Sequence, residues 1–135
     1  MIAVLDANIA LALLVELPYS AAARAALATA TTALAPDLVL YESANALWRI
    51  ANAGEMEEAA CQEVLARLPL LFDELVPAHD LGGNALAAAI AQRHPAYDCF
   101  YSVLAAQRGA TLVTADRKFA DKLRTAGTTS FLFVE

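Results

Sequence analysis

Four carboxylates occupy positions where an acidic side chain could carry out chemistry. Asp6 directly follows the apolar run "IAVL", and Asp116 lies two residues after the β-branched run "ATLVT". Asp98 comes three residues after a proline, and Glu42 lies in the early turns of a helical pattern. A charge beside a core strand costs free energy unless something pairs with it, so Asp6 in particular requires a partner.

If these four acids meet, they predict a site for a hard cation. Two carboxylates about 4 Å apart repel each other by about 4 kcal/mol at an effective dielectric constant of 20. A cluster of four therefore needs protons or a cation, and oxygen ligands without thiolate or imidazole suit Mg²⁺ or Mn²⁺. Such an ion lowers the pKa of a bound water and neutralises charge on a phosphate. The expected reaction is hydrolysis of a phosphodiester by an activated water.

Each acid also has a simpler interpretation when it is taken alone. Asp98 and Asp116 suit helix starts, where a carboxylate accepts backbone N–H groups and faces the positive end of the helix dipole. Glu42 alone is typical of a solvated surface residue. Only Asp6 favours function by itself, because an Asp placed between a strand and an apolar helix is seldom merely solvated.

Short apolar segments alternate with helical patterns along the chain. Strands are expected at 2–5, 31–36, 74–78, 110–114 and 129–134, and helices at about 8–15, 19–30, 37–53, 55–68, 81–94, 96–108 and 116–127. This alternation is typical of an α/β fold with a parallel sheet covered on both faces. Ligands of such sheets bind at the carboxyl ends of the strands, which would let Asp6 and Asp116 face each other across neighbouring strands.

The composition predicts one compact domain. The chain has 135 residues, of which 59% are hydrophobic, and its mean hydropathy is +0.49. This is enough to build one core and argues against disorder. The apolar run Ile9–Val15 has 7 residues, whereas a spanning helix needs about 20, so we expect no membrane association. No Lys or Arg precedes that run, which argues against a signal peptide and favours a cytoplasmic protein.

The charge distribution is uneven. The net charge is −6 and the isoelectric point is about 4.8, which is the wrong sign for binding nucleic acid by bulk electrostatics. Five of the nine basic residues nevertheless fall between positions 108 and 124. Four of these are candidate contacts to an RNA backbone near the acids: Arg108, Arg117, Lys118 and Lys122.

Several other residues have simple structural interpretations. Cys61 and Cys99 lie among apolar residues and predict small core side chains rather than a disulfide or a metal site. His94 lies in no motif, and we expect it at the surface. Tyr97 and Tyr101 share one helical face, and their role stays open between packing and stacking on bases.

The segments around the four acids resemble the PIN domain family. The matching stretches are "VLDANIAL", "YESANALWR", "AYDCFYSVLAAQRG" and "LVTADRKFA", which occur in the family's order and spacing over nearly the whole chain. Within the family, the sequence is similar to the VapC-like toxins of type II toxin–antitoxin systems. The resemblance implies a single PIN-like domain over residues 1–135, with a short central parallel β-sheet flanked by helices on both faces.

The resemblance also implies an activity, that of a Mg²⁺- or Mn²⁺-dependent endoribonuclease. The family's catalytic and metal-binding positions fall on Asp6, Glu42, Asp98 and Asp116. Asp6 and Asp98 resemble the main metal ligands, whereas the other two complete the shell directly or through water. The family's supporting polar positions fall on Thr114, Asn45 and Asn8, the last at a place where relatives often carry Ser.

The partners that the resemblance implies are an RNA substrate, a cognate antitoxin protein and a second copy of the chain in a homodimer. Three other functions stay open on the sequence alone. The chain could be a PIN-like RNA-processing nuclease outside a toxin–antitoxin pair, or an interaction module without catalysis. It could also be a phosphotransfer or receiver-type domain that is phosphorylated on Asp6, although the neighbours of Asp6 supply no second acid.

Overall fold

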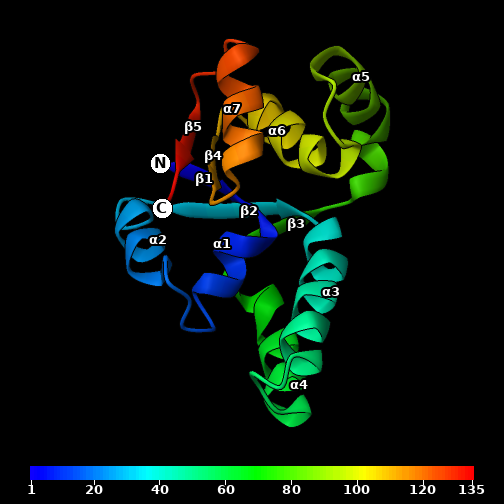
Figure 1. Cartoon of the computed structure of the whole chain (residues 1–135). Helices are drawn as coiled ribbons and strands as arrows, with labels where there is room; N and C mark the ends of the chain where they lie inside the picture. Colours follow the sequence, from blue (N-terminus) through cyan, green and yellow to red (C-terminus); the bar gives the residue numbers. More distant parts are fainter.

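The computed structural model describes residues 1–135, and it has one five-stranded sheet at its centre (Figure 1). The strands are β1 (Ile2–Leu5), β2 (Thr32–Pro36), β3 (Glu74–Val76), β4 (Thr111–Thr114) and β5 (Phe131–Phe133). Their order across the sheet is β3-β2-β1-β4-β5, and every pair is parallel. The predicted α/β fold with a parallel sheet is therefore confirmed.

Seven α-helices connect the strands. They are α1 (Ala7–Ala12), α2 (Ser20–Ala26), α3 (Leu38–Asn52), α4 (Glu58–Arg67), α5 (Gly82–Gln92), α6 (Ala96–Arg108) and α7 (Arg117–Thr125), with 3₁₀ turns at Leu68–Leu71 and Ala78–Leu81. The first two are shorter than the apolar pattern predicted, and after α2 the chain turns back to begin β2. There the Thr31 N–H donates to the Met1 carbonyl at 2.8 Å. No helix combines the length and the apolar character that crossing a bilayer requires.

Alternate side chains of the central strands pack into two different layers. Val4 lies in one buried cluster with Leu104 of α6 and Phe119 of α7. Its neighbour Leu5 lies in a second cluster, with Ile9 of α1. Figure 1 shows α6 and α7 on one side of the sheet and α1 and α2 on the other. Both faces are covered, which explains why the strands read as continuous apolar runs rather than as alternating ones.

The strand order places the starts of α1 and α7 at one edge of the sheet. The chain proceeds from β1 to β2 and β3 on one side, and then returns to β4 and β5 on the other. Such a reversal leaves a crevice at the carboxyl ends of the central strands. Leu5 pairs with Val113 in register, so β1 and β4 end side by side, and α1 and α7 begin just beyond them.

Helix α6 ends at a glycine, and this gives a test of the fold. Gly109 has φ +59°, in the left-handed region, and the following Ala110 N–H bonds the Ala105 carbonyl at 2.9 Å. Gly109→Ala should lower the free energy of unfolding by about 1 kcal/mol, because a Cβ is strained in this conformation. Urea unfolding followed by circular dichroism measures the change.

A matched control is Gly83→Ala in the first turn of α5. Gly83 has open space around its Cα and no positive φ. Alanine is the better helix former, so this variant should be as stable as the wild type or slightly more stable. Equal destabilisation by both substitutions would contradict the proposed role of Gly109.

Candidate functional site

Asp6 is a buried carboxylate at the junction between β1 and α1. Its side chain is the N-cap of α1, where Oδ1 accepts the Ile9 N–H at 2.9 Å. The Thr114 hydroxyl donates to the other oxygen, Oδ2. Only 8% of the residue is exposed. The donors that hold Asp6 in the interior are therefore neutral, and no basic side chain forms a salt bridge with it.

Thr114 joins the ends of the two central strands through one hydroxyl. It is fully buried at the end of β4, where its Oγ1 donates to Asp6 and accepts the Asp116 N–H at 3.1 Å. Asp116 in turn caps α7, because its Oδ1 accepts the Phe119 N–H at 3.0 Å. The prediction that Asp6 and Asp116 face each other across neighbouring strands is confirmed. Capping occupies one oxygen of Asp116 and leaves the second for other ligands.

Asp98 and Glu42 each accept a hydrogen bond from a side chain that orients them. Asp98 lies in the first turn of α6, and its Oδ2 is 2.6 Å from Nε2 of His94. Glu42 lies on α3, and its Oε1 accepts the Tyr101 hydroxyl at 2.6 Å. Glu42 is partly buried, so the interpretation of this residue as a solvated surface side chain is wrong.

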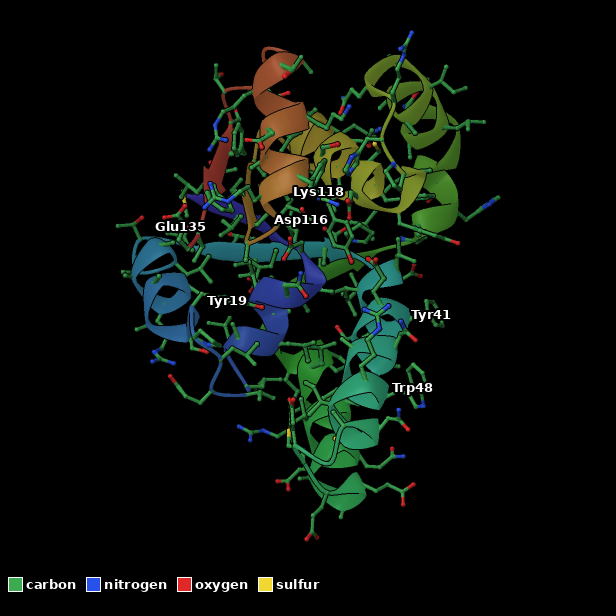
Figure 2. The ribbon with its side chains drawn as sticks, viewed as in Figure 1. Tyr19, Tyr41, Trp48, Asp116, Lys118 and Glu135 are labelled. Atoms are coloured by element: carbon green, nitrogen blue, oxygen red, sulfur yellow. The ribbon has the colours of Figure 1, made fainter.

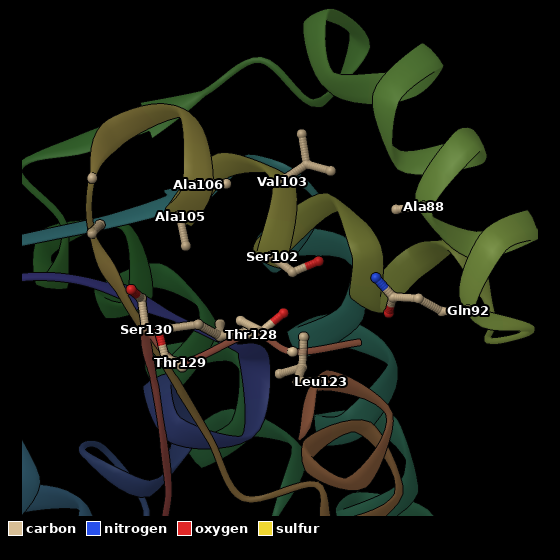
Figure 3. A pocket seen from close by; sticks show the side chains of 14 residues that line it. Ala88, Gln92, Ser102, Val103, Ala105, Ala106, Leu123, Thr128, Thr129 and Ser130 are labelled. Atoms are coloured by element: carbon tan, nitrogen blue, oxygen red, sulfur yellow. The ribbon is translucent and has the colours of Figure 1, made fainter. Parts of the chain in front are cut away.

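All four acids line one pocket, which we call the acid pocket. It has a volume of about 230 Å³, and its wall contains Asp6, Glu42, Asp98 and Asp116. The wall also includes Asn8, Asn45, Arg49 and Tyr101. A larger hollow of about 440 Å³, between α5, α6 and the segment before β5, has no charged side chain in its lining (Figure 3). Of these two spaces, only the acid pocket contains titratable groups that could do chemistry.

Burial makes the negative charges of this pocket costly. Together with smaller contributions from the charges of Asp98 and Asp116, it raises the pKa of Asp6 to about 7. Burial also raises the pKa of Glu42 and that of Asp98, each with a contribution from a neighbouring acid. The hydrogen bonds from Thr114, Tyr101 and His94 oppose these shifts without cancelling them. The pocket therefore favours any species that brings in positive charge.

The donor set of the acid pocket fits a hard divalent cation. In each of Glu42, Asp98 and Asp116, one carboxylate oxygen is engaged by a side-chain or backbone donor, so the other is free to bind a ligand. No three His, Cys, Asp or Glu side chains already stand close enough together to hold an ion. A divalent cation would lower the repulsion between these carboxylates and so allow them to approach one another. The four carboxylates of the shared pocket offer only oxygen donors, which is the ligand chemistry that Mg²⁺ and Mn²⁺ prefer.

The four predicted RNA contacts divide into two groups. Arg108 makes a bidentate ion pair with Glu74 at 2.7 and 2.9 Å, at the end of α6 away from Asp98. Arg117 pairs with Glu135 and lies 5.0 Å from the centre of the Phe133 ring. The structure does not bring these two to the acid pocket.

Lys118 and Lys122 lie next to the acid pocket instead. They line a second hollow, here called the lysine hollow, which shares Asp98 and Asp116 with the acid pocket. Figure 2 shows Lys118 beside Asp116 at the start of α7. Neither lysine forms an ion pair with a carboxylate, so both ammonium groups are available to a ligand.

Sequence reasoning missed three residues of the site. Arg49 lies seven positions after Glu42 on α3, a spacing that places both on one helical face. His94 precedes Asp98 by four residues, and its ring stacks on Phe119 with 5.2 Å between centroids. The His94 side chain is 8% exposed, so the expected surface position is wrong. Helical spacing could have identified Arg49, whereas His94 lies in the turn between α5 and α6, outside both helices.

Tyr101 could not be assigned from the sequence. Its ring is buried, whereas Tyr97 on the same helix is 65% exposed. The partner of its hydroxyl, Glu42, lies 59 residues earlier on another helix. Cys61 and Cys99 are buried and free, as predicted.

Comparison with known families identifies the fold. Residues 3–123 match the PIN domain. The chain belongs to the PIN domain family. It is 34% identical over 122 residues to Ribonuclease VapC3 of Pyrobaculum aerophilum, covering 88% of this chain and 92% of that protein. It is 33% identical over 90 residues to Exonuclease VapC9 of the same organism, covering 66% and 65%.

Solved structures agree with this assignment of the PIN domain. The crystal structure of PAE2754 from Pyrobaculum aerophilum superposes with a TM-score of 0.71 at 25% identity, over 97% of this chain and 87% of that one. VapBC2 from Rickettsia felis, bound to a DNA fragment from its promoter, gives a TM-score of 0.64 at 15% identity over the full length of both chains. The second likeness concerns the fold alone.

The raised pKa of Asp6 predicts how stability depends on pH. Folded Asp6 keeps its proton up to about pH 7, whereas the unfolded group loses it near 3.8. The folded state therefore binds more protons between these values, and the stability of the metal-free PIN domain should fall as pH rises from 4 to 7. At about 1.4 kcal/mol per pKa unit, the contribution of Asp6 to this loss is at most about 4 kcal/mol.

Asp6→Asn should remove this contribution, because asparagine can still cap α1. In urea unfolding with a chelator present, the variant should gain on the wild type by up to about 3 kcal/mol between pH 5 and pH 8. Glu63→Gln, on the exposed surface of α4, is the control; because it keeps Asp6, its stability relative to the wild type should change little with pH. A difference between Asp6→Asn and wild type that does not change with pH would contradict the burial cost.

Proposed function

We propose that this PIN domain is a cytoplasmic, Mg²⁺- or Mn²⁺-dependent endoribonuclease that acts as the toxin of a type II toxin–antitoxin pair. The observation that carries the proposal is the convergence of Asp6, Glu42, Asp98 and Asp116 on one pocket at the carboxyl edge of a parallel sheet. Two relatives are named a ribonuclease and an exonuclease, which supports cleavage of nucleic acid.

The residues of the acid pocket take separate roles in this proposal. Asp6 and Asp98 would hold the cation, and Glu42 and Asp116 would complete its shell directly or through water. When bound, the ion supplies a water of lowered pKa and neutralises charge on the phosphate. Thr114 keeps Asp6 and Asp116 at a fixed separation through its two hydrogen bonds.

Proton transfer and substrate contacts fall to the remaining side chains. Tyr101 holds Oε1 of Glu42, so Oε2 can accept a proton from the attacking water. Its raised pKa makes the Glu42 carboxylate a stronger base toward that water. Arg49 brings a cation to the pocket wall, where it can bind a phosphate oxygen of the substrate. Asn8 and Asn45 supply amide donors in the same wall.

Three partners complete the proposal: an RNA substrate, a cognate antitoxin and a second copy of this chain in a homodimer. The Rickettsia felis structure is that of a VapBC2 assembly on DNA, and its fold is shared here. An acidic pocket with raised pKa values is a suitable target for a basic side chain from an antitoxin segment. A short neighbouring gene that encodes a DNA-binding head and a charged tail would separate the toxin role from RNA processing.

The phosphotransfer alternative is disfavoured by the position of Asp6. Both of its oxygens accept hydrogen bonds, and the residue is nearly excluded from solvent. A carboxylate oxygen that accepts one hydrogen bond keeps a second lone pair for a small cation. A phosphoacceptor must also admit a bulky phosphodonor in line with its oxygen, and the 8% exposure of Asp6 leaves little room for one.

The proposed activity is tested with a circular RNA, which has no ends and so reports only internal cleavage. Wild-type protein with Mn²⁺ or Mg²⁺ should convert the circle to linear products, and a chelator should stop the reaction. Asp98→Asn should lower the rate at least 100-fold, because it removes a charged ligand of the cation. Product lengths on a denaturing gel measure both effects.

The matched control is again Glu63→Gln, which should cut like the wild type. Cleavage of linear but not circular RNA would replace the endonuclease proposal with an exonuclease. Undiminished cleavage by Asp98→Asn would refute the assignment of the site.

His94 provides a second test, because we propose that it positions Asp98. His94→Phe keeps a ring against Phe119 but removes the donor to Asp98, whereas His94→Gln keeps an N–H donor. Loss of the donor should weaken Mn²⁺ binding about 10-fold or more, as outer-shell partners of metal ligands commonly do. Calorimetric titration with Mn²⁺ measures the affinity, and His94→Gln should fall between wild type and His94→Phe. Equal affinity of wild type and His94→Phe would show that Asp98 needs no such support.

A further inference from the structure

The pairing of the basic residues separates them into two sets. Four of the nine form ion pairs with carboxylates: Arg24 with Glu16, Arg108 with Glu74, Arg117 with Glu135 and Arg124 with Asp121. The other five have no carboxylate partner: Arg49, Arg67, Arg93, Lys118 and Lys122. Only this second set can offer an unshared positive charge to a ligand.

Four of the five unpaired cations line three adjoining hollows. Arg49 is in the wall of the acid pocket, and Lys118 and Lys122 are in the lysine hollow, which shares Asp98 and Asp116 with it. A third hollow contains Arg93 and shares Lys122 with the lysine hollow. Shared lining residues make the three hollows continuous across the surface.

The charges along this run favour an anionic strand. Lys118 and Lys122 lie one helical turn apart on α7, about 6 Å along its axis. Asp121 lies beside them, but its Oδ1 is 2.8 Å from Nη1 of Arg124, which offsets its charge. Although the protein is acidic overall, four of its five unpaired basic side chains therefore lie in the acid pocket or in the two hollows that adjoin it.

Arg93 occupies a backbone position that would suit glycine. It has φ +53°, the only positive φ of a non-glycine residue in the chain, at the turn between α5 and α6. A side chain in this conformation costs stability relative to glycine. Strained residues of this kind gather where a side chain is needed for function, and the guanidinium is what distinguishes arginine here.

We infer that an RNA strand crosses the PIN domain along Arg49, Lys118, Lys122 and Arg93, with its phosphates on these side chains and the cleaved bond at the acid pocket. We call these four residues the cation path. The inference rests on the proposed nuclease function and extends it. It adds Arg49 and Arg93 to the substrate contacts, and it leaves out Arg108 and Arg117, whose charges are already paired.

The cation path ends at Arg93, because the next hollow along the surface has no basic side chain in its lining. The hollow with Arg93 shares Gln92 with the large hollow of Figure 3, and no Arg or Lys lines that larger space. Phosphate contacts should therefore stop at Arg93, and longer RNA should gain little affinity beyond it.

The test measures binding without cleavage. In a chain that carries Asp98→Asn, with Mg²⁺ present, the affinity for a fluorescent single-stranded RNA 20-mer is followed by anisotropy over a series of salt concentrations. Arg93→Gly should weaken binding on the order of fivefold at low salt, and Lys122→Ala should do the same. Each should also reduce the slope of log affinity against log salt concentration by about 0.7, the value expected for one lost phosphate contact.

Two variants control for charge and for folding. Arg67→Ala removes an unpaired cation outside the cation path and should leave the affinity and the slope unchanged. Arg93→Lys keeps the charge and should retain most of the affinity. Arg93→Gly relieves the backbone strain, so its unfolding midpoint should equal or exceed that of the wild type.

The outcomes separate the cation path from the nuclease proposal. If Arg93→Gly and Lys122→Ala bind with the affinity and slope of Arg67→Ala while the wild type still cuts RNA, the cation path is wrong and the nuclease stands. If the wild type neither binds nor cuts RNA, both are overturned. If only the path variants lose affinity and slope, the inference is supported.

Discussion

The acid pocket depends on a carboxylate that is buried between two parallel strands and held there by neutral donors. Asp6 takes a backbone N–H from the helix that it caps and a hydroxyl from Thr114 on the neighbouring strand. These bonds fix the position of the carboxylate but supply no positive charge. The free energy of the site is therefore lowered by a proton or by a cation, and this preference connects the fold to the proposed chemistry.

At Asp6, the requirements of stability and of function conflict. A neutral residue in place of Asp6 would remove the cost of burying a charge, yet it would also remove the ligand that the pocket offers to a cation. Arg93 shows a smaller conflict of the same kind, because glycine would be more stable at its positive φ but would lack the guanidinium. Natural proteins depart from locally favourable choices mainly at functional sites, and both departures lie on one connected surface.

The overall acidity of the chain is compatible with RNA as a substrate because charge pairing is selective. Arg108 and Arg117 form ion pairs with nearby carboxylates, whereas Lys118 and Lys122 do not. The electrostatic attraction for a polyanion is then confined to a narrow region beside the acid pocket. Binding over such a limited region should be weak without additional contacts.

The sequence by itself determined the elements and the identity of the acids. Short apolar strands between helical patterns predicted the parallel α/β sheet, and the residues that follow the strands predicted Asp6 and Asp116 at its carboxyl edge. These features are local, because strand patterns, caps and turns depend on neighbouring residues. Helical spacing from Glu42 also contained the position of Arg49, although it could not say that this side chain lines the pocket.

Only the tertiary structure decided which side chains meet across long separations in the chain. The hydroxyl of Tyr101 donates to Glu42, and that of Thr114 donates to Asp6. Arg108 forms an ion pair with Glu74 and does not line the acid pocket. Each of these pairs joins different elements, so its geometry follows from strand order and helix packing, which no local pattern encodes. The division of the cations into paired and unpaired sets has the same origin, because an ion pair forms only where packing brings the two charges within a few ångströms.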